Sequence, residues 1–417
     1  MSFRVFSKCS DESRNRSLRC ALFPAFIVPG FYCVRLVLFC FAVAAIFSCT
    51  TALALEYVRF RHLGKERSEE GRVILEAPDG IAFEARDGQL YTIKQRNLLT
   101  RRSDDLPFKP YTKAEILERL KEEFPASEGY NYLDMYDSFI VVYTTSKPFA
   151  TWYGNLLKKV YEFYVLHWKR LGMKLTEPKF MMVAVVLSSE ERFQQYAKQD
   201  AAPLFPGQCA YYHKLTNRIA MYDMSGLQAF QERDQRRITA ADIERFLVQP
   251  GSYHNIMAVC HEAAHQVGYN VGMHPRHTPS VPVWICEGLA TLHEVPDQKD
   301  KRVGWTLGPH VNTSRLDQLR RYLNTPRLES PIQKMIQNDD LLRTPATALD
   351  NYALAWGVTY YLVRKRPKEL AAYLTLLQTK TSDSDDDADI RIREFESCFG
   401  SDWDAFYRDF AAYMRRL

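Results

Sequence analysis

Residues Asn255 to Val267 read Asn-Ile-Met-Ala-Val-Cys-His-Glu-Ala-Ala-His-Gln-Val, and the apolar positions in this run favour a buried helix. Helix positions four apart lie one turn apart on the same face, so His261 and His265 project together. That spacing lets two imidazole nitrogens reach one Zn²⁺ at roughly 2.0–2.1 Å each. Three ionisable side chains on a buried helix are costly unless a partner such as a metal ion compensates them. The pattern therefore predicts a metal site, with Glu262 beside a bound water.

The third protein ligand has to come from elsewhere, because a catalytic zinc keeps its fourth position for water. The longer pattern His-Glu-x-x-His-x-x-Gly-x-x-His matches up to Gly268, but its last position is Val271, which cannot ligate. Glu287 is the better candidate, since it is a carboxylate in the middle of an apolar helical stretch and would be costly there without a cation. The small residues Gly288 and Ala290 are expected to let this helix approach the first one. Three histidines also remain available in principle: His274, His277 and His293.

Glu294 competes with Glu287, because it lies two turns further along on the same helix face. It could instead accept a hydrogen bond from a ligand histidine and orient that ring. The plain alternative is a solvated helix end before Pro296.

The two motifs together resemble those of the gluzincin zinc metallopeptidases, in particular the peptidase-MA-like group: His261-Glu262-x-x-His265 and Trp284-x-x-Glu287-Gly288-x-Ala290. They more closely resemble an uncharacterised bacterial family with a small N-terminal β module, known only as a domain of unknown function. The motif pair covers residues 255–294, and the order of strands and helices extends the likeness to about 130–415.

The resemblance implies that His261, His265 and Glu287 bind zinc and that Glu262 is the general base. It also implies a Tyr or His well beyond the third ligand that stabilises the oxyanion. Tyr352 is well placed for this role, His310 is the alternative, and Tyr352 could equally be an ordinary core tyrosine.

The chain departs from the best-known gluzincins in two ways. No Gly-Ala-Met-Glu-Asn-type aminopeptidase motif precedes the first helix, so specificity for free N-termini is not implied. The gap between His265 and Glu287 is also slightly longer than in those proteins.

The composition is that of an ordinary globular protein and gives no support for a polyanionic partner. The 417 residues suffice for two or three domains, and 46% apolar with 25% charged residues is ordinary for a globular protein. The net charge of +5 is weak and no nucleic-acid motif appears, so no nucleic-acid partner is expected. Four cysteines lie beyond residue 56, too far apart for a disulfide framework; we expect buried free thiols, although an exported protein could pair some: Cys209, Cys260, Cys286 and Cys398.

Residues 36–55 are uncharged, follow Arg35 and include Ala52-Leu53-Ala54. This pattern predicts a secretory signal cleaved after Ala54, and hence an exported protein that is periplasmic, secreted or anchored in the envelope. An uncleaved membrane anchor is the alternative, because twenty uncharged residues can span a bilayer and would associate the protein with the membrane.

Four segments follow from these patterns: a leader at 1–54, a small β module at 55–108, a linker helix at 109–128 and a zincin-like catalytic domain at 129–417. Two Asp-Gly turns separate the expected strands of the β module, and Thr112 with Glu115 forms a capping box for the linker helix.

Several elements are expected in the fourth segment. They are strands at 139–143 and 180–187, a hairpin at 209–222, and helices at 152–171, 233–247 and 403–414. The hairpin precedes the His-Glu-x-x-His helix, and an exposed strand there could pair with a substrate backbone. The acidic run 381–389 lacks the Gly and the terminal Glu of an EF-hand loop, so we expect a solvated loop.

We therefore expect an α+β fold and a zinc-dependent peptidase that hydrolyses peptides or proteins outside the cytoplasm. Zn²⁺ would lower the pKa of a bound water to about 7. Glu262 would take the proton and deliver it to the leaving amine, and Tyr352 would help to stabilise the oxyanion. The alternative is a non-catalytic zinc-binding or scaffold protein of the cell envelope with a degenerate peptidase fold.

Overall fold

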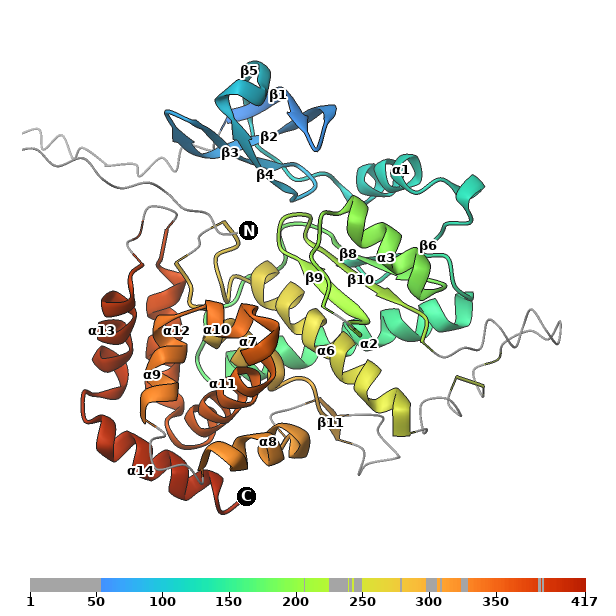
Figure 1. Ribbon diagram of the computed structural model, residues 1–417. Helices are drawn as coiled ribbons and strands as arrows, with labels where there is room; N and C mark the ends of the chain where they lie inside the picture. The colour runs from blue at the N-terminus through green and yellow to red at the C-terminus, as the bar shows by residue number, and fades with distance from the viewer. Residues whose placement is uncertain are drawn as a thin grey trace, which may run out of the picture. The chain divides into compact units, whose positions relative to one another are not determined.

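Alternating apolar residues and tight turns build the first sheet, which is antiparallel and has the order β4-β3-β2-β1-β5 (blue in Figure 1). Its strands are β1 (Ala54–His62), β2 (Lys65–Ala77), β3 (Gly80–Ala85), β4 (Leu90–Lys94) and β5 (Leu98–Pro107). The β2–β3 turn needs Gly80, because its φ is +155° and an added Cβ would lie 2.1 Å from the carbonyl oxygen of Ile93. The structure thus has the predicted β module, although strands β1 and β5 were not predicted individually.

The computed structural model describes residues 54–205, 207–224, 239, 242–243, 250–277, 280–297, 306–307, 310–323, 329–381, 384 and 386–417. Apart from Ala54, the predicted leader lies outside these ranges, as does most of the predicted helix at 233–247. Within the described ranges, no helix is both long and apolar enough to cross a membrane.

Helix α1 (Lys113–Glu123) follows the first sheet and confirms the predicted capping box. The Thr112 hydroxyl accepts a hydrogen bond from the backbone N–H of Glu115, and the Glu115 carboxylate accepts one from the backbone N–H of Thr112. A short 3₁₀ turn, η2 (Ala126–Glu128), comes after Pro125.

The second sheet has the order β6-β7-β8-β10-β9 and carries the predicted strands and hairpin. Its members are β6 (Asn131–Met135), β7 (Phe139–Tyr143), β8 (Met182–Leu187), β9 (Ala210–His213) and β10 (Arg218–Tyr222). The pairs β7–β8 and β8–β10 are parallel, whereas β6–β7 and β9–β10 are antiparallel. Strand β9 is therefore an edge strand.

Helices cover both faces of this sheet, which explains why β7 and β8 are continuously apolar. Alternate residues such as Val141 and Ala184 pack with α2 (Lys147–Arg170) and α6 (Pro250–Asn270). The intervening residues, such as Val142 and Val185, pack with α1 and α3 (Glu190–Gln199). Figure 1 shows α3 and α6 beside this sheet.

Helix α2 begins five residues before the predicted start at Trp152. Ser146 caps it by accepting a hydrogen bond from the backbone N–H of Phe149, and Pro148 occupies the first turn, where its missing N–H costs nothing. Several apolar side chains of this helix, such as Leu156 and Val160, are buried in the core.

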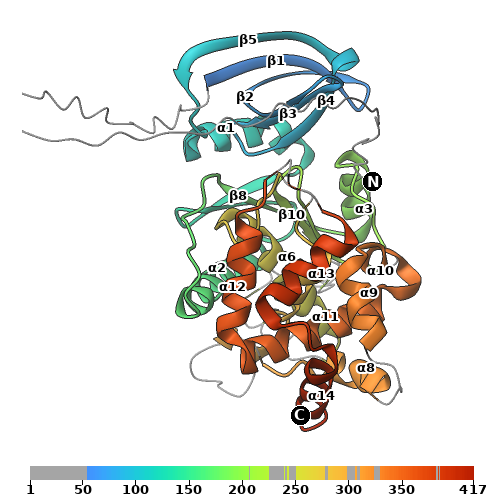
Figure 2. The same cartoon turned by 90° about the vertical axis from the view of Figure 1, so that its left-hand side faces the viewer.

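The remaining elements are mostly helices (Figures 1 and 2). They are α7 (Val283–Thr291), α8 (Thr313–Leu323), α9 (Glu329–Gln337), α10 (Asp340–Arg343), α11 (Pro345–Lys365), α12 (Pro367–Gln378), α13 (Ala388–Phe399) and α14 (Trp403–Met414), with two-residue strands β11 (Pro296–Asp297) and β12 (Thr306–Leu307). Helix α14 begins at Trp403 and ends at Met414, as predicted from its apolar residues. Helix α11 is almost entirely buried from Ala353 to Val363, so it forms the centre of the helical core.

The acidic segment 381–389 was predicted to be a solvated loop; Thr381, Asp387 and Asp389 are exposed, as expected, whereas Asp386 is half-buried. Asp386 forms ion pairs with the buried Arg391 and with Lys380, and Asp387 caps α13 by accepting a hydrogen bond from the backbone N–H of Ile390. Composition alone misses this, because the partner cations precede and follow the acidic run.

The four cysteines of the described part of the chain are free. Cys260 and Cys286 are buried, as expected, whereas Cys209 and Cys398 are half-buried.

Candidate metal centre

Helix α6 carries both predicted histidine ligands on one face, and their rings lie 4.7 Å apart in an edge-to-face arrangement. The opposite side of the helix is fixed to the second sheet. The Gln266 side chain donates hydrogen bonds to the carbonyl oxygens of Val183 (3.1 Å) and Asn217 (2.9 Å). These buried contacts fix the rotation of α6, and so the direction in which His261 and His265 point.

Three ligand atoms converge at this site, from His261 and His265 on α6 and from Glu287 on α7. The Nε2 atoms of the two histidines lie 3.1 Å apart, and Glu287 Oε2 lies 3.0 Å from Nε2 of His261 and 3.1 Å from that of His265. Within the described ranges, these residues form the one group with metal-ligand geometry. The structure thus brings together the three side chains that the sequence nominated as ligands.

The donor set and the triangle fit zinc. Ligands about 2.0–2.1 Å from a tetrahedral zinc lie roughly 3.3–3.4 Å from one another, close to the separations at this site. His261 Nδ1 lies 3.0 Å from Glu294 Oε1, so a neutral His261 donates Nδ1–H there and presents its lone pair at Nε2. A carboxylate oxygen and imidazole lone pairs then face one another, an arrangement that a cation satisfies.

The charges of the cluster also favour a cation at its centre. Burial lowers the pKa of His261, but hydrogen bonds with Glu287 and Glu294 outweigh burial and raise that pKa to about 10. Burial raises the pKa of Glu287, but the charge on His265 and the histidine hydrogen bonds hold it below its usual range.

Glu294 lies behind His261 and is buried, so it is neither a solvated helix end nor a member of the three-atom group. Besides its contact with His261, it accepts hydrogen bonds from Asn312 Nδ2 (2.8 Å) and from Arg315 Nε and Nη2 (3.2 and 3.0 Å). Asn312 and Arg315 were not found from the sequence, because their distance from the motifs gives no local signal. Together they fix the carboxylate that orients His261.

Glu262 lies on α6 between the two histidines and reaches the edge strand of the second sheet. Its Oε2 accepts a hydrogen bond from the backbone N–H of Tyr212 in β9 (2.8 Å). Burial raises the pKa of Glu262, and the opposing charges of His261 and His265 do not fully offset this. A carboxylate with a raised pKa is suited to proton transfer near neutral pH.

Tyr352 on α11 lies at the same cluster. Its ring is 5.9 Å from that of His261, and the guanidinium of Arg315 lies 5.4 Å from its centre. Burial raises the pKa of the Tyr352 hydroxyl well above its ordinary value, and the charges of Glu287 and Glu262 and a hydrogen bond with Glu287 raise it further. The hydroxyl therefore stays protonated and can donate a hydrogen bond.

The alternative ligands do not join the three-atom group. His274 and His293 are buried, and burial lowers the pKa of each to about 3. His293 stacks on Tyr164 at 4.8 Å. Within the described part of the chain, neither His277 nor His310, which was the alternative to Tyr352 for the oxyanion, belongs to a metal-binding group.

Gly288 was expected to let α7 approach α6, and this expectation is wrong. An added Cβ would lie 2.1 Å from Oγ1 of Thr359 and 3.0 Å from the carbonyl oxygen of Ala355, both on α11. The small residue therefore serves the contact between α7 and α11, which the sequence could not distinguish from a contact with α6.

Comparison with known proteins relates part of the chain, including this site, to a family of unknown function. Residues 255–382 match the family model described as Protein of unknown function (DUF1570). The matched segment includes the three clustered residues His261, His265 and Glu287, together with Glu262, Glu294 and Tyr352. No curated protein matches the chain.

Proposed function

We propose that this protein is a zinc-dependent peptidase that hydrolyses peptide bonds outside the cytoplasm. The observation that carries the proposal is the convergence of His261, His265 and Glu287 on one point, with Glu262 beside it. The likeness of the two motifs to gluzincins supports a zincin-like catalytic domain. Export rests on the uncharged run at 36–55.

The side chains divide the chemistry among them. Zinc bound by the three ligands would supply an acidic water and polarise the scissile carbonyl. Glu262 takes the proton of the attacking water and delivers it to the leaving amine. Tyr352 donates a hydrogen bond to the carbonyl oxygen as negative charge develops on it.

Strand β9 supports a peptide substrate. It is an edge strand of the second sheet, and the backbone N–H of Tyr212 points away from β10 toward Glu262. An extended peptide that pairs with this edge is carried past the carboxylate, with main-chain hydrogen bonds that do not depend on its sequence.

The decisive experiment compares wild-type protein with Glu262→Gln in a peptide-library digest and a zinc measurement. We expect the wild type to bind zinc and to cleave peptides, and Glu262→Gln to keep the zinc and lose cleavage, because an amide cannot accept the proton. Glu118→Gln makes the same change on the exposed face of α1 and should keep full activity. Full activity of Glu262→Gln would show that the base is another residue, and a zinc-loaded wild type without cleavage would favour the non-catalytic alternative.

A further inference from the structure

Helix α7 carries the third ligand but does not cap its own N-terminus. Pro282 occupies the N-cap position and makes no side-chain capping hydrogen bond, so the first N–H groups of α7 need partners from elsewhere. The backbone N–H of Val283 donates to Oδ1 of Asp339, 2.9 Å away. Asp339 lies between α9 and α10, so the start of α7 is tied to a distant segment.

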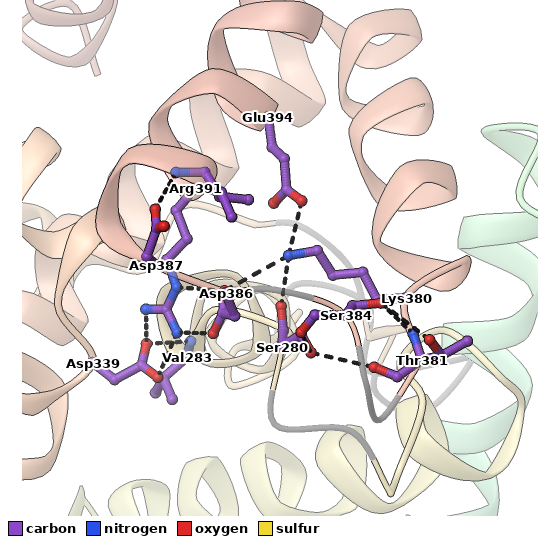
Figure 3. A network of polar contacts seen from close by, with 11 residues as sticks. Ser280, Val283, Asp339, Lys380, Thr381, Ser384, Asp386, Asp387, Arg391 and Glu394 are labelled. Carbon is purple, nitrogen blue, oxygen red and sulfur yellow. Dashed lines mark hydrogen bonds and ion pairs between the residues drawn. The ribbon is translucent and has the colours of Figure 1, made fainter. Parts of the chain in front are cut away.

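Arg391 of α13 fixes Asp339 in turn (Figure 3). Its Nη1 and Nη2 donate to the two oxygens of Asp339 at 2.8 and 3.1 Å. Its Nε and Nη2 donate to the two oxygens of Asp386 at 2.8 and 2.6 Å. The guanidinium is buried and planar, so paired hydrogen bonds on two sides define both position and orientation.

A second tether reaches the chain just before α7. Lys380 Nζ donates to the carbonyl oxygen of Ser280 at 2.9 Å and pairs with Glu394 at 2.9 Å and Asp386 at 3.7 Å. Asp386 is thus a counter-ion to both tethering cations, Lys380 and Arg391. Figure 3 shows these side chains converging on the segment 280–283.

The position of these tethers bears on the ligand. Glu287 lies four residues, one helical turn, after Val283, and α7 has only nine residues. A shift of the N-terminus of α7 therefore moves the Glu287 carboxylate by nearly the same distance. Zinc–oxygen bonds at about 2.0–2.2 Å tolerate deviations of only about 0.2 Å, so small displacements weaken binding.

We propose that Arg391, acting through Asp339 and Asp386, is a positioning residue for Glu287 and sets the zinc affinity of the site from α13. This inference rests on the proposed metal site. It also gives the acidic segment a role, since Asp386 holds the guanidinium in place.

The test is the zinc affinity of Arg391→Met, measured by competition with a chromophoric chelator on protein whose folding is checked by circular dichroism. We expect binding about tenfold weaker than wild type, as for loss of other groups that orient a ligand. Folding should survive, because Trp284 of α7 still packs on Tyr373 and Phe395 at ring distances of 6.0 and 6.2 Å.

Arg366→Met is the matched control. Arg366 donates to the carbonyl oxygen of Phe399 (2.9 Å) and to Glu369 (3.2 Å), so its loss also breaks an ion pair in the helical region, but not one tied to α7. Unchanged zinc affinity in this variant separates positioning from general destabilisation.

A milder pair of variants decides the matter if Arg391→Met does not fold. Asp386→Asn removes one counter-ion of the clamp and should weaken zinc binding, whereas Asp389→Asn removes the same charge from an exposed position of α13 and should not. If Arg391→Met folds and binds zinc with wild-type affinity, the positioning role is overturned but the metal site is not. If Arg391→Met does not fold, wild-type zinc affinity in Asp386→Asn has the same consequence. A wild type that binds no zinc overturns the metal site as well.

Discussion

Replacing Gly288 by Ala tests how Glu287 is positioned. Helix propensity by itself favours the substitution by about 1 kcal/mol, because glycine loses more backbone entropy than alanine in a helix. The structure opposes it: the new Cβ would lie 2.1 Å from Thr359 Oγ1. This is roughly 1 Å short of an ordinary van der Waals separation.

Overpacking should outweigh helix propensity, so Gly288→Ala should be destabilising. Thr359 is fully buried, so it has little room to move, and forced shifts in a packed core cost about 1–3 kcal/mol. We expect Gly288→Ala to lower the free energy of unfolding by up to about 2 kcal/mol after the propensity gain of about 1 kcal/mol is subtracted. A displacement of α7 by a few tenths of an ångström also moves Glu287, and zinc should bind about 10–100-fold more weakly.

Urea unfolding and chelator competition measure the two effects. A second substitution, Thr359→Ala, removes the clashing oxygen, which has no hydrogen-bond partner within the described part of the chain. The double variant should recover much of the stability and zinc affinity, with a favourable coupling energy between the two positions. If Gly288→Ala is more stable than wild type and binds zinc normally, the contact between α7 and α11 does not position Glu287.

Three further predictions concern the surroundings of the site. Glu294→Gln should weaken zinc binding about 10–100-fold in chelator competition, because the amide orients His261 less strongly; unchanged affinity would remove Glu294 from the site. Tyr352→Phe should keep zinc and lower kcat about 100-fold on a cleavable peptide, with loss of zinc instead indicating a structural role. Burial lowers the pKa of His293 to about 3, so the unfolded chain takes up its proton first, below pH 6.5. His293→Phe should therefore reduce the acid-induced loss of stability by up to about 1.4 kcal/mol per pH unit between pH 6.5 and 3 in urea unfolding, and an unchanged slope would contradict this.

Local signals in the sequence predicted local structure well. Thr112 and Glu115 cap α1 because the two residues meet within one helical turn, whatever the rest of the chain does. The Asp-Gly turns and apolar runs similarly identified β2, β3, β4, β7 and β8. Prediction was wrong where the partner was distant: Gly288 contacts α11 rather than α6, and Asp386 pairs with Arg391 and Lys380 in a run that was predicted to be solvated.

The candidate site shows the same division. Helical periodicity placed His261 and His265 on one face and Glu262 between them, because residues four apart on a helix share a face in any fold. The sequence also nominated Glu287, since a carboxylate in an apolar helix needs a cation.

Only the tertiary structure decided which carboxylate completes the cluster and which residues support it. Glu287 contacts both histidines, whereas Glu294 contacts only one of them, at Nδ1 of His261. Arg315 on α8 binds Glu294, and Arg391 on α13 binds Asp339. These contacts depend on how separate helices pack, and packing is set by the shapes of many buried side chains at once. No short stretch of sequence encodes that arrangement, whereas one turn of helix suffices to encode a pair of ligands.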